Sequence, residues 1–143
     1  MAFTTERERR LVLGVLPELL ALRPSVYRAR VGAVLCDRRG NVLSIGFNQH
    51  RTHPKAARWH TKGGRPFCCT VHAEMDVLIR NPVATKTSGV FLGVSRVRRI
   101  GPGLGFETCL ALPCAGCMEA IGDLGVKRVL FTTSNDTTGE LRL

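Results

Sequence analysis

Two short motifs in the chain carry side chains that can bind a transition metal and transfer protons. The first, His72-Ala73-Glu74, opens a helix-forming stretch, and the second, Pro113-Cys114-Ala115-Gly116-Cys117, holds two cysteines three positions apart. Thiolates at this spacing on a first helical turn point the same way, and the positive N-terminal end of the helix stabilises their charge. The two cysteines suit zinc but leave a tetrahedral ion two ligands short.

His72 can supply a third ligand and water the fourth, which would leave Glu74 beside that water as a proton carrier. Three protein ligands and one open position are typical of a catalytic zinc site rather than a structural one. The competing interpretation is a surface helix start and two buried cysteines without a chemical role. Two motifs in this order, each at an expected helix start, favour the zinc site.

The segments around the motifs predict a single domain over residues 1–143. A chain of 143 residues can bury one substantial core. The first expected helix runs from Thr5 to about Leu22, with Thr5 and Glu8 as a capping box and with Pro17 bending or dividing it.

Farther along the chain, strands and helices are expected to alternate. Residues 49–69 and the glycine-rich stretch IGPGLG at residues 100–105 are expected to be loops. Strands are expected at residues 31–36, 41–47, 89–97 and 126–132, and helices at about 71–80 and 114–125. This order predicts an α/β sandwich.

The motifs H-A-E and P-C-A-G-C, in this order, resemble the signature of the cytidine deaminase-like superfamily. The resemblance extends over roughly residues 30–135, from the hairpin VGAVLCDRRGNVLSIGFN to the strand LGVKRVLFTTSND. It implies a three-layer α-β-α sandwich with a central mixed sheet. Residues 98–112 depart from the family pattern, because many members have only a few residues before the P-C-x-x-C proline. The role of this insertion stays open.

The resemblance also implies roles for individual residues. Three side chains would ligate zinc: His72, Cys114 and Cys117. Zinc would activate a water that attacks the carbon bearing the amine, and Glu74 would carry protons from that water to the ring nitrogen and the departing ammonia. Asn48 and the main chain at Ala73 would contact the substrate, although Asn48 also suits a turn that closes the hairpin.

The long loop at residues 49–69 carries further candidates. Its basic residues and one tryptophan suit contact with a substrate phosphate, with a solvated basic loop as the alternative. These residues are Arg51, Lys55, Arg58 and Trp59. Five other side chains could hold a second, structural zinc, but they lack a recognisable ligand spacing and are expected to line the loop. They are His50, His53, His60, Cys68 and Cys69.

The net charge of +10, from 21 basic and 11 acidic residues, favours a phosphate-bearing partner. No apolar run approaches the ~20 residues that cross a membrane, and no secretion signal is evident, so a cytoplasmic protein without a membrane partner is expected. Members of the superfamily commonly assemble, which implies a homo-oligomer.

These observations lead to three hypotheses. The first is a zinc-dependent hydrolytic deaminase that converts cytosine to uracil in a free nucleoside or nucleotide such as deoxycytidylate. The second is a deaminase acting on cytosine or adenine in single-stranded DNA or RNA, which the charge favours and the lack of additional C-terminal helices disfavours. The third is a non-catalytic zinc-binding interaction domain, which would have no need of Glu74.

Overall fold

The computed structural model describes residues 5–22, 29–49, 61–62, 65–66, 72–80, 91–134 and 137–143. Within these residues the chain forms a six-stranded sheet in the order β2-β1-β5-β7-β8, with β6 paired to β5. β5 and β7 are parallel and the other neighbours are antiparallel, so the sheet is mixed. The strands are β1 (Ala29–Cys36), β2 (Val42–Phe47), β5 (Phe91–Arg99), β6 (Phe106–Cys109), β7 (Arg128–Ser134) and β8 (Thr137–Arg142).

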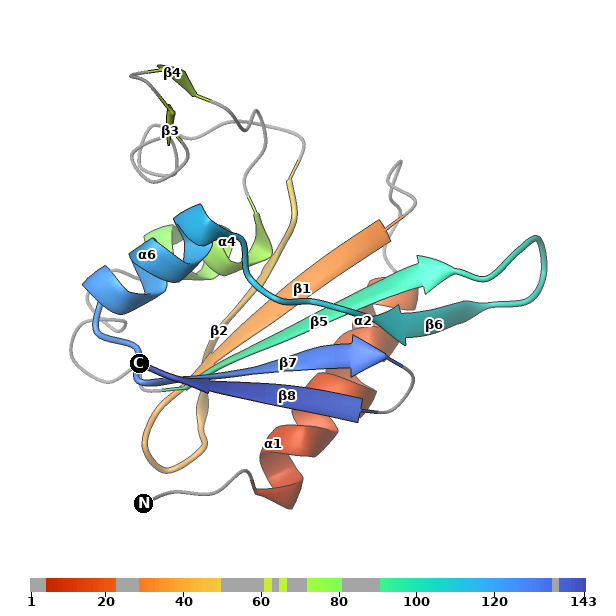
Figure 1. Ribbon diagram of the computed structural model, residues 1–143. Helices are drawn as coiled ribbons and strands as arrows, with labels where there is room; N and C mark the ends of the chain where they lie inside the picture. The colour runs from red at the N-terminus through yellow and green to blue at the C-terminus, as the bar shows by residue number, and fades with distance from the viewer. Residues whose placement is uncertain are drawn as a thin grey trace.

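Helices cover both faces of this sheet (Figure 1). One face carries α1 (Glu6–Arg10) and α2 (Leu16–Leu22), and the other carries α4 (Ala73–Arg80) and α6 (Ala115–Asp123). Neighbouring side chains of β5 point to opposite faces, so Phe91 packs with the N-terminal helices, whereas Leu92 and Val94 pack with α4 and α6. The predicted three-layer α-β-α sandwich around a mixed sheet is confirmed.

The N-terminal helix is divided close to Pro17, as its sequence predicts. Thr5 and Glu8 form the expected capping box, in which each side chain accepts a hydrogen bond from the main-chain N–H of the other. A π-helical turn at Leu11–Val15 then separates α1 from α2, and the Leu16 N–H donates to the Leu11 carbonyl. Pro17 has no N–H to give to the preceding turn, and the wider turn lies where that bond is missing.

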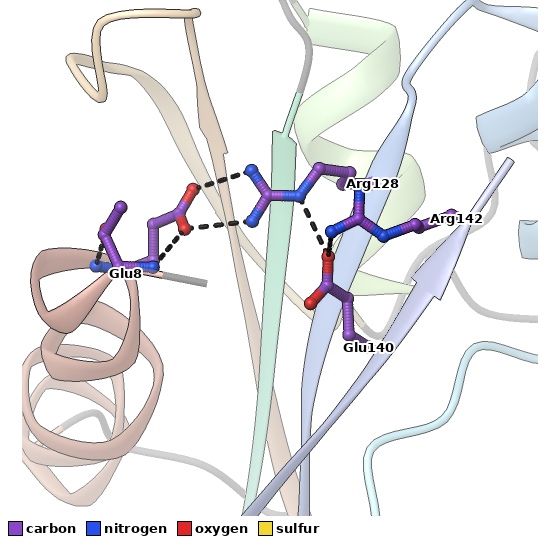
Figure 2. Close-up of polar contacts among 5 residues, drawn as sticks. Glu8, Arg128, Glu140 and Arg142 are labelled. Atoms are coloured by element: carbon purple, nitrogen blue, oxygen red, sulfur yellow. Dashed lines mark hydrogen bonds and ion pairs between the residues drawn. The ribbon is translucent and has the colours of Figure 1, made fainter. Parts of the chain in front are cut away.

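An ion-pair cluster fastens α1 to the far edge of the sheet (Figure 2). The Arg128 guanidinium on β7 donates to both carboxylate oxygens of Glu8, at 2.9 and 3.2 Å. Its Nε donates to Glu140 on β8 at 3.0 Å, and Glu140 also pairs with Arg142 at 3.3 Å. Arg128 therefore links the first helix to the last two strands.

β5 and β6 form a hairpin around the glycine-rich loop at residues 100–105, which was expected, whereas the strand β6 was not predicted. β5 continues to Arg99, and β6 pairs back on it with Cys109 opposite Arg96. Gly103 and Gly105 have φ values of +72° and +81°, which allow the chain to reverse between the strands. The strand FETC is partly exposed along its whole length and lacks the apolar alternation that identifies a strand in a sequence.

Two very short strands lie inside a segment that was expected to be a loop. Thr61–Lys62 (β3) and Arg65–Pro66 (β4) pair antiparallel inside the segment 49–69, which was expected to be loop throughout. A two-residue ladder carries no sequence periodicity from which it could be recognised.

α4 packs closely against β2 because Gly46 has no side chain. A Cβ atom at Gly46 would lie 2.6 Å from Val77 Cγ2, 2.8 Å from Val77 N and 2.9 Å from the Ala73 carbonyl oxygen. The buried Asp76 carboxylate also accepts a hydrogen bond from the Phe47 N–H at 3.0 Å. These contacts fix the first turn of α4 against the end of β2.

We therefore expect Gly46→Ala to lower the free energy of unfolding by about 1–3 kcal/mol, because main-chain atoms of α4 would have to move. Urea unfolding monitored by circular dichroism measures this. Gly122→Ala is the matched control, since a Cβ at that position in α6 meets no atom within 4 Å. A loss of stability in the control as large as that of Gly46→Ala would contradict the close-packing explanation.

Candidate active site

The two sequence motifs meet on one side of the sheet, at the starts of α4 and α6. His72 directly precedes α4, Cys114 is the N-cap of α6, and Cys117 lies in the first turn of α6. The His72 Nδ1 atom lies 3.3 Å from Cys117 Sγ and 3.5 Å from Cys114 Sγ. The ligand atoms of all three residues lie within 4.8 Å of one another, as the sequence predicts.

The chemistry of these three side chains fits zinc. Two thiolates and an imidazole are ligands that zinc prefers, and three of them leave a coordination position for water. The hydrogen bond to Cys114, together with burial, raises the pKa of the Cys117 thiol well above its usual value. A bound cation would stabilise both sulfurs as thiolates. In the part of the chain that the structure describes, no other group of three His, Cys, Asp or Glu side chains comes this close.

Glu74 lies in the first turn of α4, one residue beyond the Ala73 that begins the helix. It is a buried carboxyl, with 5% of its surface exposed. Burial raises its pKa above the usual value for a glutamate, while its own main-chain N–H and the nearby His72 act in the opposite direction. A raised pKa is common among catalytic carboxyls, and the proton-carrying role of Glu74 stays a prediction.

A cavity of about 310 Å³ opens beside the zinc ligands. This volume is at the lower end of the roughly 300–1,000 Å³ range of small-molecule sites. Five residues proposed from the sequence line it, namely Asn48, His72, Ala73, Glu74 and Cys114. Five further lining residues were not proposed, namely Val31, Arg96, Leu110, Ala111 and Leu112.

Asn48 takes part in the main-chain ladder at the end of the β1–β2 hairpin. Its side-chain Oδ1 accepts from the Val31 N–H at 3.1 Å, and its own N–H donates to the Val31 carbonyl at 3.1 Å. Asn48 is not a turn residue, because the turn of this hairpin lies at Asp37–Asn41 and Asn48 is at the open end. Its side-chain oxygen accepts a hydrogen bond from β1, and its amide nitrogen is left as the end that can donate to a ligand. Contact of Asn48 with a substrate stays a prediction.

The outer wall of the cavity is built by residues 110–112, which end the insertion. The buried Thr132 hydroxyl donates to the Cys109 carbonyl at 2.6 Å and accepts from the Arg96 N–H at 3.2 Å. The Ala111 N–H then donates to the Thr132 carbonyl at 2.8 Å. One buried threonine thus joins β5, β6 and the segment that leads to Cys114, so that the end of the insertion lines the cavity.

Nine of the candidate residues lie outside the residues that the structure describes. They are the proposed phosphate contacts Arg51, Lys55, Arg58 and Trp59 and the candidates for a second zinc, His50, His53, His60, Cys68 and Cys69. Their roles stay predictions. Among the described helices, none is both long enough and apolar enough to span a bilayer.

Comparison with known proteins is consistent with the geometry of the site. No curated protein sequence was found to match the chain. Residues 18–133 match the family model described as the cytidine and deoxycytidylate deaminase zinc-binding region, and this match includes His72, Cys114 and Cys117. With a match over most of its length and a metal-binding triad in the expected place, the chain belongs to the zinc-dependent cytidine and deoxycytidylate deaminase family.

Proposed function

We propose that the protein is a hydrolytic deaminase that converts cytosine to uracil in a free nucleoside or nucleotide such as deoxycytidylate. The observation that carries this proposal is the position of Glu74, a buried carboxyl that lines the same cavity as the zinc ligands His72 and Cys114. A proton carrier, a metal site and a cavity of nucleoside size thus occur together. A structural zinc site would need neither the carboxyl nor the cavity.

The reaction exchanges an amine for a carbonyl oxygen: water adds to the carbon that bears the amine, and ammonia leaves. His72, Cys114 and Cys117 would hold the zinc, which supplies Lewis acidity that lowers the pKa of a water ligand. Glu74 would first pass a proton from the attacking water to the ring nitrogen, and would then pass the remaining proton, from the hydroxyl of the adduct, to the departing amine. Glu74 is unchanged at the end, so the proton count balances.

Other residues of the cavity would orient the base. The Asn48 amide nitrogen and the main-chain N–H of Ala73 can donate to oxygens of the substrate, and both residues line the cavity. Val31 and Leu112 provide apolar walls that cover the ring and exclude bulk water. Since the β1–β2 hairpin and α4 are joined through Gly46 and Asp76, these groups would keep a fixed geometry relative to the zinc ligands.

A deaminase acting on single-stranded DNA or RNA is the second candidate, favoured by the net charge of +10. Such an enzyme needs an extended groove with aromatic platforms for flanking bases. The described lining of the cavity contains no aromatic side chain. Trp59, the aromatic candidate, lies outside the described residues, so a free substrate is ranked first on the small volume of the cavity, about 310 Å³.

Ammonia release from a panel of nucleosides, 5′-monophosphates and short single-stranded oligonucleotides tests the proposal. We expect a free cytosine nucleotide to be deaminated faster than the same base in an oligonucleotide, with adenine compounds unchanged. Zinc-loaded protein is used throughout, with metal content measured on the same sample. Turnover of oligonucleotides together with inert free nucleotides would reverse the ranking, and a zinc-loaded protein inert on the whole panel would favour an interaction domain.

A further inference from the structure

The face of β5 that packs against α4 and α6 changes from apolar to basic at the cavity. Leu92 and Val94 are buried in the core on this face, and the next residue on the same face, Arg96, is exposed and lines the cavity. Its partner in the neighbouring strand β1 is Val31, another cavity residue. Arg96 therefore projects from the rigid centre of the sheet at the edge of the zinc site.

A second cavity of about 440 Å³ adjoins the first on the surface of the β5–β6 hairpin. Arg96 and Leu110 line both cavities, so the arginine lies where they meet. A base in the zinc cavity would leave its sugar substituents pointing out of a space that is small for a whole nucleotide. Arg96 lies at the boundary between the two cavities, where these substituents would pass from the first into the second.

The Arg96 guanidinium is not engaged by a described carboxylate, unlike that of Arg98 on the same face of β5. Arg98 donates from Nε to the Glu107 carboxylate at 2.7 Å. None of the carboxylates in the described ranges forms an ion pair with Arg96. The main chain of Arg96 is nevertheless fixed, since its N–H donates to the buried Thr132 hydroxyl at 3.2 Å. A guanidinium on an anchored strand, with no carboxylate partner among the described residues, is suited to bind an anion from the ligand.

We infer that Arg96 binds the phosphate of a nucleoside monophosphate whose base occupies the zinc cavity, and so selects nucleotides over nucleosides. This inference rests on the proposed function and names the substrate class of the same site. The guanidinium offers a planar fork of donors that matches two phosphate oxygens. Arg96 is a separate candidate from the basic residues Arg51, Lys55 and Arg58, which lie outside the described residues.

The first test compares Arg96→Gln with wild type by kcat/KM for deoxycytidine and for its 5′- and 3′-monophosphates. We expect kcat/KM for the preferred monophosphate to fall by about 10- to 100-fold, the effect of one lost charge-assisted contact. The value for deoxycytidine should stay within about twofold. The loss for the monophosphate should shrink as salt is raised, since the site is open to solvent.

Arg99→Gln is the matched control. It removes the same charge from the same strand, but Arg99 points to the opposite face, where its guanidinium lies 5.8 Å from the Phe106 ring. It should leave the preference for monophosphates unchanged. An equal fall for nucleoside and nucleotide in Arg96→Gln, or an equal fall in both variants, would overturn the inference.

A binding measurement separates this inference from the proposed reaction. Zinc-loaded Glu74→Gln protein, with and without Arg96→Gln, is titrated calorimetrically with deoxycytidine and with each monophosphate. Tighter binding of a monophosphate that Arg96→Gln abolishes supports the phosphate site, even if wild type deaminates none of the three. Deamination by wild type with no effect of Arg96 on monophosphate binding would retain the reaction and reject the phosphate site.

Discussion

Glu74→Gln is expected to keep zinc and fold but to lose deaminase turnover by about 10²–10⁴-fold, the usual contribution of a general acid–base group. The amide has nearly the shape of the carboxyl, so packing in the first turn of α4 should be retained. It cannot accept the proton of the attacking water. Because Glu74 is not one of the three residues whose ligand atoms converge, its removal should leave the metal in place.

Ammonia release, metal analysis and thermal unfolding of the same preparation test this expectation. Glu18→Gln serves as the control, since it makes the same chemical change at an exposed position of α2 on the other face of the sheet. Near-wild-type turnover in Glu74→Gln would remove the proposed mechanism. Loss of zinc in that variant would instead show that Glu74 helps to hold the metal.

The metal triad could be predicted from the sequence because each half of it is a local feature. Cys114 and Cys117 are brought together by one helical turn, and His72 precedes a helix whose start is evident in the sequence. Only the contact between α4 and α6 joins residues far apart in the sequence, and that contact was expected from the resemblance to a known family. The capping box at Thr5 and Glu8 was predictable for the same local reason.

The substrate side of the site could not be predicted, because it depends on pairing between distant strands. Arg96 lies at the cavity because β5 continues beyond Val94, a core residue on the same face, and Arg96 stands opposite Cys109 of β6. The buried Thr132 then places residues 110–112 against the opening. In the sequence, Arg96 is one basic residue among 21, and nothing in its neighbours distinguishes it.

The packing that fixes α4 was also hidden in the sequence. Gly46 reads as an ordinary residue of a strand, and Asp76 as a solvated acidic group in the first turn of a helix. In the structure both are buried contacts between β2 and α4. A glycine required by close approach differs from any other glycine only through atoms that are remote in the chain.

Cys117→Ala is expected to abolish stable zinc binding and, with it, turnover. It removes one of three protein ligands, a change more severe than the loss of an outer hydrogen-bond partner, which alone weakens metal binding by about 10–100-fold. Metal analysis after dialysis against a weak chelator should give one zinc per wild-type chain and almost none in the variant. The variant should also unfold at a lower temperature, because zinc that binds the folded state stabilises it.

Cys36→Ala is the control for removal of a buried thiol. Cys36 packs on the opposite face of the sheet, and burial raises the pKa of its thiol to about 11, so it has little tendency to act as a thiolate ligand. This variant should keep its zinc, although a small loss of stability is expected from the missing atom. Zinc retained in full by Cys117→Ala would contradict the assigned ligand set.

The same measurement decides whether a second zinc exists. Two zincs per wild-type chain, with one lost in Cys68→Ala and the other in Cys117→Ala, would show that the loop at residues 49–69 holds a structural ion. Only the zinc held by His72, Cys114 and Cys117 should then matter for the chemical step, because Glu74 lines the cavity beside these ligands. A Cys68→Ala variant with one zinc and normal turnover would leave a single catalytic ion, which is the outcome we expect from the irregular spacing of the other candidates.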